Sequence, residues 1–285
     1  MNGRPRSVSM DLIRSLALFS VIGVHFFLNT GYYKIPVHGT QMFVMTWVRS
    51  FFMICVPLFI LLSGFLMCNK KPGRQYYKGI VKILGVYALA SIVCFGYDCI
   101  MQTKVFSFEE LIYSILKYKA APYAWYVDMY IGLFLMIPFL NICYHNISTQ
   151  KQKRILLYTA VAITSLPAVF NAEEQLLPDF WVSLYPICYY FIGCYIREYG
   201  CKVKKYLLCI LLCCSTLVLT AASYYYSYDV KFIWGSWQKW QSLYVLVQAL
   251  CVFLLLKDVS FDKDNKTTRF FAKLLRKISE LSFGG

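Results

Sequence analysis

The chain has 285 residues, of which 59% are hydrophobic and only 15% are charged. A soluble domain of this length would carry about a quarter charged residues, so the composition excludes an ordinary soluble protein. The net charge of +15 would suit a nucleic-acid-binding protein. The cations, however, occupy short loops between apolar stretches, where Lys and Arg report membrane orientation, and nucleic acid is not an expected partner.

Eight apolar stretches are long enough to cross a bilayer as helices. They cover about residues 10–30, 44–67, 79–100, 122–143, 154–171, 180–196, 205–227 and 238–257. The pattern predicts an all-α fold, a polytopic transmembrane helical bundle that forms a single membrane-embedded domain over residues 1–285. A segment that begins near Ser279 has the character of a further span and stops at Gly285. We therefore expect one or more final helices to be missing.

Lys and Arg are distributed unequally between alternate sides of these spans. With a cytoplasmic N-terminus, 22 of the 29 fall on the cytoplasmic side, which is the asymmetry of the positive-inside rule. We predict a multi-pass protein of the cytoplasmic membrane. Residues 267–281 form a segment with an apolar and a basic helical face. It is expected either to lie among anionic headgroups or to pack on the bundle as a connecting helix.

Three ionisable residues share one face of the first span. Ionisable groups are costly inside a membrane, and those that remain suggest a function. The eleven residues from Arg14 to His25 turn a helix by about 1100°, roughly 20° past three full turns, and place His25 about 16 Å beyond Arg14. Asp11 lies on the same face. The plainer interpretation is an ion pair between Asp11 and Arg14 at the helix start, with His25 hydrogen-bonded to a neighbouring helix.

Other candidate residues occur in the second and fourth spans. Ser63 and Gly64 allow another helix or a ligand to approach the backbone closely. Trp125 at the outer edge of the fourth span is typical of an interface anchor. Asp128 follows one or two turns inside, and it could pair with His25 and orient the imidazole, as carboxylates do for catalytic histidines. The twelve cysteines lie mostly in apolar stretches without metal-type spacing, so no metal site is expected.

Together these segments resemble acyltransferase family 3, a family of membrane-embedded enzymes that acylate, mostly acetylate, cell-surface glycans. The resemblance begins with Arg14 and His25 in the spacing Arg-x10-His, and it continues in residues 59–66, 125–127, 132–133, 138–140, 190–198 and 279–284. The family has about ten spans. Two departures concern Lys78 and Lys82, which stand where the family has closely spaced arginines, and Tyr123, which replaces a frequent His.

The resemblance implies transfer of an acyl group, acetyl by family habit, from cytoplasmic acyl-CoA to a hydroxyl of an extracytoplasmic glycan or lipid-linked sugar. It assigns a catalytic role to His25, with Asp128 beside it. The residues expected to bind the donor are Asp11, Arg14, Ser63, Gly64, Lys78, Lys82 and Trp125. Acyl-CoA is then a substrate, no permanently bound cofactor is expected, and membrane lipid is the remaining partner.

Two other functions stay open at the level of sequence. One is a transporter or flippase of a glycan precursor, with His25 and Asp128 in a polar pathway, although the inverted repeats common in transporters are not evident. The other is a non-catalytic membrane sensor or substrate-entry module attached to a larger protein, as in some relatives of the family.

Overall fold

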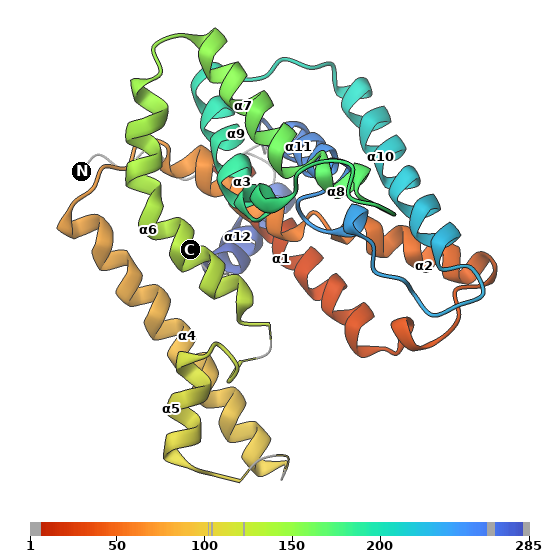
Figure 1. The fold of residues 1–285 in the computed structure, drawn as a ribbon. Coiled ribbons are helices and arrows are strands. Elements are labelled where there is room, and N and C mark those ends of the chain that lie inside the picture. Colours follow the sequence, from red (N-terminus) through yellow and green to blue (C-terminus); the bar gives the residue numbers. More distant parts are fainter. Residues whose placement is uncertain (1–6, 102, 104, 122, 261–265, 282–285) are drawn as a thin grey trace. The chain divides into compact units, whose positions relative to one another are not determined.

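The computed structural model describes residues 7–101, 103, 105–121, 123–260 and 266–281 (Figure 1). Within these ranges the regular elements are helices, and extended pairing is limited to the isolated bridges Pro36–Lys231 and Val37–Tyr228. Seven helical segments of the described chain are long and apolar enough to cross a membrane. The predicted all-α membrane bundle is confirmed at this level.

The helices follow the predicted spans closely, and each span contains helix at the expected place. In chain order they are α1 (Val8–Asn29), α2 (Gly39–Phe52), α3 (Cys55–Met67), α4 (Arg74–Ile100), α5 (Phe108–Leu116), α6 (Trp125–Asn146), α7 (Gln150–Thr164), α8 (Pro167–Phe170), α9 (Tyr185–Tyr199), α10 (Lys205–Tyr226), α11 (Leu243–Leu256) and α12 (Lys266–Leu281). Three 3₁₀ turns join them: η1 (Tyr32–Lys34), η2 (Phe180–Leu184) and η3 (Ser236–Gln238).

Two of the predicted spans are interrupted, and a proline explains each break. Proline lacks an N–H group, and its ring crowds the carbonyl group four residues earlier. Pro57 lies at the start of α3, and the carbonyl that it crowds belongs to Met53, which together with Ile54 separates α2 from α3. Pro167 opens α8 in the same way, just after α7 ends.

The described chain folds into two compact units. The first contains the residues up to Cys68 and those from Ser148 onward, and the second contains Asn69–Ile147. The first unit therefore holds α1–α3 and α7–α12, and the second holds α4–α6. A single domain over residues 1–285 stays a prediction.

The core of the first unit is built around α3, which contacts α1, α9 and α11. A Cβ atom on Gly64 would lie 2.1 Å from the carbonyl oxygen of Tyr190, and one on Gly193 would lie 2.3 Å from the carbonyl oxygen of Leu61. The backbones of α3 and α9 are thus in direct contact. Small residues allow this approach between membrane helices, where packing rather than the hydrophobic effect drives association.

The loop of residues 30–38 and the loop of residues 227–242 are joined at one end of the first unit. The amide of Val37 donates to the carbonyl of Val230 at 2.9 Å, and the amide of Asp229 donates to the carbonyl of Val37 at 3.1 Å. The imidazole of His38 lies 2.7 Å from the Asp229 carboxylate. The last turns of α1 and α10 consequently lie on the same side of the unit.

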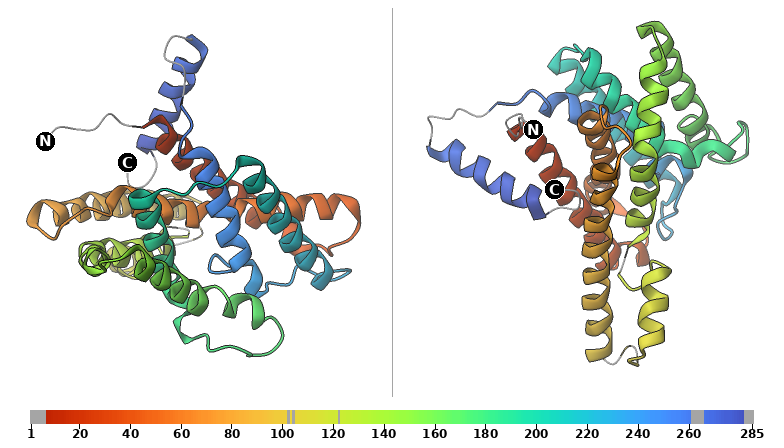
Figure 2. Two further views of the ribbon diagram at one scale, coloured as in Figure 1. Left: turned by 90° about the horizontal axis from the view of Figure 1, so that it is seen from above. Right: turned by 90° about the vertical axis from the view of Figure 1, so that its left-hand side faces the viewer.

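The helix α12 packs on the start of α1 (Figure 2). The Ser15 hydroxyl donates to the carbonyl of Leu275 at 3.4 Å, so this segment does pack on the bundle as a connecting helix. Phe270 and Phe271 remain exposed on another side of it, and a position among lipid headgroups stays a prediction. Ser279, the expected start of a new span, lies instead in the last turns of α12, and residues 282–285 are outside the described part.

In the second unit, α4 packs against α6 (Figure 2). The Tyr76 ring stacks on the Phe134 ring with centroids 4.5 Å apart. Near the middle of α4, the Tyr87 hydroxyl donates to the carbonyl of Ile115 in α5 at 2.8 Å. Aromatic stacking and side-chain-to-backbone hydrogen bonds therefore hold these three helices together.

Candidate functional site

The first helix carries Arg14 and His25, the two residues to which the sequence assigns the main chemical roles. Because α1 runs without a break from Val8 to Asn29, the spacing expected of Arg14 and His25 applies to a continuous helix. Both side chains are half-buried. Arg14 and His25 lie between the buried face and the exposed face of α1. The buried face contains Ile13, Ala17, Ser20 and Val24, and the exposed face contains Phe19, Ile22 and Phe26.

The beginning of α1 is a polar site covered by α12. Arg14 Nη1 donates a hydrogen bond to the Ser279 hydroxyl at 2.8 Å, and the Asp11 side chain beside it is buried, with only 3% exposure. Sequence reasoning missed Ser279 as a partner, because 265 residues separate it from Arg14 and no spacing rule connects them. The contact holds the Arg14 guanidinium against α12 at the start of α1.

His25 lies four residues before the end of α1, about 6 Å along the helix axis. Its backbone carbonyl accepts a hydrogen bond from the Asn29 side chain at 2.7 Å, which keeps the last turn of the helix in place. Two residues later, the Phe27 ring packs edge-on against Tyr32 at 5.0 Å. A half-buried imidazole at this end of α1 can accept a proton from a hydroxyl group brought to it.

Ser63 and Gly64 belong to the interface between α3 and α9. The Ser63 hydroxyl donates to the Phe59 carbonyl in the preceding turn at 2.9 Å, a common arrangement for a hydroxyl inside a helix. Gly64 lies against the α9 backbone. The sequence allowed either another helix or a ligand to approach Gly64. The structure places the helix α9 there, and donor binding by Ser63 and Gly64 stays a prediction.

The remaining predicted residues belong to the second unit. Lys78 and Lys82 lie four residues apart on one face of α4, and both are exposed. Trp125 is the first residue of α6, and Asp128 lies in the first turn of that helix, nearer its end than the sequence suggested. A carboxylate is favourable at a helix N-terminus. Asp128 belongs to the second unit and His25 to the first. Their expected pairing therefore stays a prediction.

Asp128 has a neighbour that the sequence did not suggest. Burial raises the pKa of the Tyr118 hydroxyl, and the nearby Asp128 carboxylate raises it further. Both effects keep Tyr118 neutral at physiological pH, so its hydroxyl remains a hydrogen-bond donor close to that carboxylate.

Two buried cations of the first unit were also missed. Lys153 in α7 has only 4% of its side chain exposed and lies 2.8 Å from the Glu198 carboxylate in α9. Arg49 in α2 is completely buried, although the sequence places it among the far-side charges. Neither could be identified from spacing, because the partners are distant in sequence.

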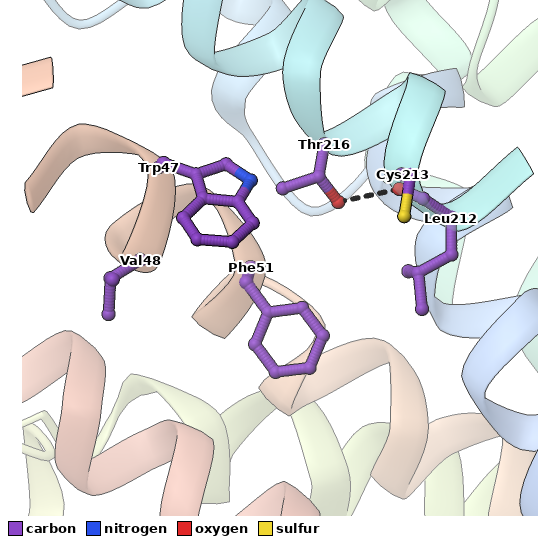
Figure 3. Close-up of a pocket in the computed structure, with 6 residues that line it drawn as sticks. All are labelled: Trp47, Val48, Phe51, Leu212, Cys213 and Thr216. Atoms are coloured by element: carbon purple, nitrogen blue, oxygen red, sulfur yellow. Dashed lines mark hydrogen bonds between the residues drawn. The ribbon is translucent and has the colours of Figure 1, made fainter. Parts of the chain in front are cut away.

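An apolar groove lies between α2 and α10 (Figure 3). Its volume is about 310 Å³, and it is lined by Trp47, Val48, Phe51, Leu212, Cys213 and Thr216. The Thr216 hydroxyl is already engaged, because it donates to the Leu212 carbonyl at 2.7 Å. With no charged side chain in its lining, the groove suits a hydrocarbon chain rather than a phosphate.

Comparison with known protein families gives one decisive match. Residues 7–284 match the model of an acyltransferase domain, that of acyltransferase family 3. The chain belongs to this acyltransferase family. The comparisons with curated proteins and with solved structures give no match.

Membership favours an acyltransferase among the classes of function that the sequence left open. The protein is an acyltransferase, and its apolar helices make it a membrane acyltransferase. The family model covers residues of both structural units, so the acyltransferase domain includes α4–α6 as well as the larger helical core.

Proposed function

We propose that this acyltransferase moves an acyl group, acetyl in the simplest case, from cytoplasmic acyl-CoA to a hydroxyl of a glycan or lipid-linked sugar beyond the cytoplasmic membrane. The observation that carries the proposal is the unbroken helix α1. It presents a guanidinium near one end and an imidazole near the other, about 16 Å apart along its axis. The guanidinium suits a CoA phosphate, and the imidazole suits the hydroxyl of an acceptor.

In the proposed reaction His25 is the general base. Its imidazole takes the proton of the acceptor hydroxyl while that oxygen attacks the thioester carbon. The new carbon–oxygen bond forms, the carbon–sulfur bond breaks, and the CoA thiolate leaves with the proton that the imidazolium returns. Asp128 is proposed to orient the ring, as carboxylates do in catalytic triads.

Donor binding is proposed for residues most of which lie near the cytoplasmic ends of the helices; Trp125 lies instead at the outer edge of its span. Arg14 would form a forked pair with a phosphate, which an ammonium group cannot do, and the exposed Lys78 and Lys82 would add point charges. The full proposed set is Asp11, Arg14, Ser63, Gly64, Lys78, Lys82 and Trp125.

The proposed topology has eight crossings and a cytoplasmic N-terminus. Hydrogen bonds join the 30–38 and 227–242 loops, so an even number of crossings must separate them. Five of the seven long helical segments lie between these loops, and five is odd. If η2 and α9, residues 180–199, form one further crossing, the number becomes six. This pairing supports α9 as the eighth span, and the excess of Lys and Arg on one side supports the orientation.

The proposal is tested with sealed membrane vesicles and acetyl-CoA labelled in its acetyl group. Inverted vesicles, which expose the cytoplasmic face, should transfer label to glycan when they contain the protein, whereas right-side-out vesicles should not. Vesicles without the protein are the control. Equal transfer in both orientations would contradict the proposed sidedness, and transfer equal to that of the control would contradict the proposed activity.

A further inference from the structure

Arg49 is the most unusual charged residue of the first unit. Its side chain is 0% exposed, and its Nε atom donates to the Tyr33 hydroxyl at 2.8 Å. The guanidinium carbon lies 4.5 Å from the centre of the Phe232 ring and 4.7 Å from that of Trp234. Residues from both joined loops thus enclose a cation that α2 provides.

The two terminal nitrogens of Arg49 have no partner among the described residues. In the part of the chain that the structure describes, Nη1 and Nη2 donate no hydrogen bond, and no carboxylate pairs with them. Burial raises the pKa of the nearby Tyr32 to about 12, so this phenol is neutral. Its hydroxyl lies 2.6 Å from the Thr46 hydroxyl.

The buried positive charge of Arg49 would be stabilised by a bound anion. Arginine does not lose its proton in proteins, and a buried ion without a counter-ion is strongly unfavourable. The aromatic faces offset part of this cost by cation–π attraction. These rings do not accept hydrogen bonds from the N–H groups of Nη1 and Nη2. The edge of the guanidinium that carries these groups matches a carboxylate or a phosphate in geometry.

Trp234 is the most exposed of the three aromatic rings that lie against the Arg49 guanidinium. Trp234 has 51% of its surface exposed, and it stacks on Tyr33 with ring centres 4.8 Å apart and an angle of 28° between the planes. Rotation of this indole would open a way to Arg49. A flat indole face at the rim also suits the apolar face of a sugar ring.

Arg49 lies at the same end of the first unit as His25. Phe27, two residues after His25, contacts the Tyr32 ring, and Tyr32 contacts the Tyr33 ring at 4.9 Å. The hydroxyl of Tyr33 then receives the Arg49 hydrogen bond. A continuous row of aromatic side chains therefore connects the buried cation with the end of α1 that carries the imidazole.

We propose that Arg49 binds the carboxylate or phosphate of an anionic sugar, whose ring stacks on Trp234. The inference rests on the proposed function in one respect, since it takes this sugar to be the acyl acceptor. It adds that the acceptor is negatively charged and that α2, rather than α1, selects it.

Binding can be tested without measuring acyl transfer. Purified protein in a neutral detergent without a sugar headgroup is heated with D-glucuronate, D-glucose or inorganic phosphate. Glucuronate at saturating concentration should raise the Tm by about 2–4 °C, whereas glucose, which has a neutral hydroxymethyl group in place of the carboxylate, should not. Stabilisation by inorganic phosphate alone would identify phosphate as the anionic group. An equal effect of glucuronate and glucose without any effect of phosphate would overturn the proposal, and this comparison needs no variant.

Substitution of Arg49 separates a binding site from a structural clamp. Arg49→Met removes a buried unpaired charge, so the unliganded protein should keep its Tm while the response to the anion disappears. Lys34→Met is the matched control, because Lys34 is an exposed cation of the adjoining loop and its loss should leave the response intact. An anion response that persists in Arg49→Met would assign Arg49 a structural role only. The response should also persist in His25→Ala, so failure of the catalytic proposal would leave this result unchanged.

Discussion

In the proposed mechanism, a guanidinium and an imidazole on one helix set the geometry in which donor and acceptor meet. The spacing of Arg14 and His25 corresponds to about three helical turns, and α1 is continuous through both. The residues therefore cannot change their separation without unwinding the helix. This rigidity is what general base catalysis needs, because the base must lie within hydrogen-bonding reach of the proton that it removes.

The first prediction concerns His25. His25→Ala should lower kcat roughly 10²- to 10⁴-fold, the usual contribution of a positioned general base, and should leave membrane insertion unchanged. Initial rates with labelled acetyl-CoA measure the effect. His145→Ala is the matched control, because His145 lies at the far end of α6 and has no part in the proposed site. Full activity of His25→Ala would remove this residue from the mechanism.

The second prediction distinguishes a donor-binding role of Arg14 from a purely structural one. Arg14→Ala should raise the KM for acyl-CoA roughly tenfold or more, because a charge-assisted hydrogen bond to the donor is lost. Ser279→Ala removes a hydroxyl that accepts a hydrogen bond from Arg14 and keeps the guanidinium, so it should leave that KM nearly unchanged. If both variants instead lower the Tm equally and leave the KM unchanged, the contact between α1 and α12 is structural.

At the scale of elements, the contact between α3 and α9 gives a structural role to two of the segments that resemble the family, residues 59–66 and 190–198. Gly64 and Gly193 lie where the two backbones meet, and each falls in a segment that the sequence relates to the family. Such glycines serve helix association in membranes. The signature around Ser63 and Gly64 thus preserves the core that holds α1 in place, whatever its role toward the donor.

The third prediction tests this contact. Gly64→Ala should lower the free energy of unfolding by about 2 kcal/mol or more, because the new methyl group would overlap the Tyr190 carbonyl in a core that tolerates overpacking poorly. Thermal unfolding in detergent measures the change. Gly85→Ala is the control, since a Cβ atom on Gly85 meets nothing within 4 Å and alanine favours the helix by up to about 1 kcal/mol. Equal stability of the two variants would contradict the close approach of α3 and α9.

At the scale of the whole molecule, the number of crossings decides which residues can meet the proposed cytoplasmic donor. The joined loops require an even number of crossings between them, and the length of α9 alone does not identify it as a span. With α9 counted as a crossing, Arg14 lies near one face of the membrane and the Arg49 cluster near the other.

The fourth prediction tests this topology with single cysteines in a background without the others. Cysteine at Gln175, in the exposed loop before η2, should react with a membrane-impermeant maleimide in intact cells. The native Cys201, in the exposed loop after α9, should react only after permeabilisation. Labelling of both from the same side would show that α9 does not cross the membrane.

The sequence by itself determined the helical membrane fold, the positions of the eight apolar stretches and the placement of Arg14 and His25 along one helix. These properties depend on local composition and on the fixed rise and turn of a helix. The family membership inferred from the motifs was confirmed.

Only the tertiary structure decided which distant side chains meet. The partnership of Arg14 with Ser279, the contact of Gly64 with α9 and the burial of Arg49 all join residues far apart in the chain. The hydrophobicity of these helices determines that they cross the bilayer. It says little about which helix packs against which, because lipid and neighbouring helices are almost equally apolar. Shape, small residues and a few polar contacts make that choice, and they act only once the helices have come together.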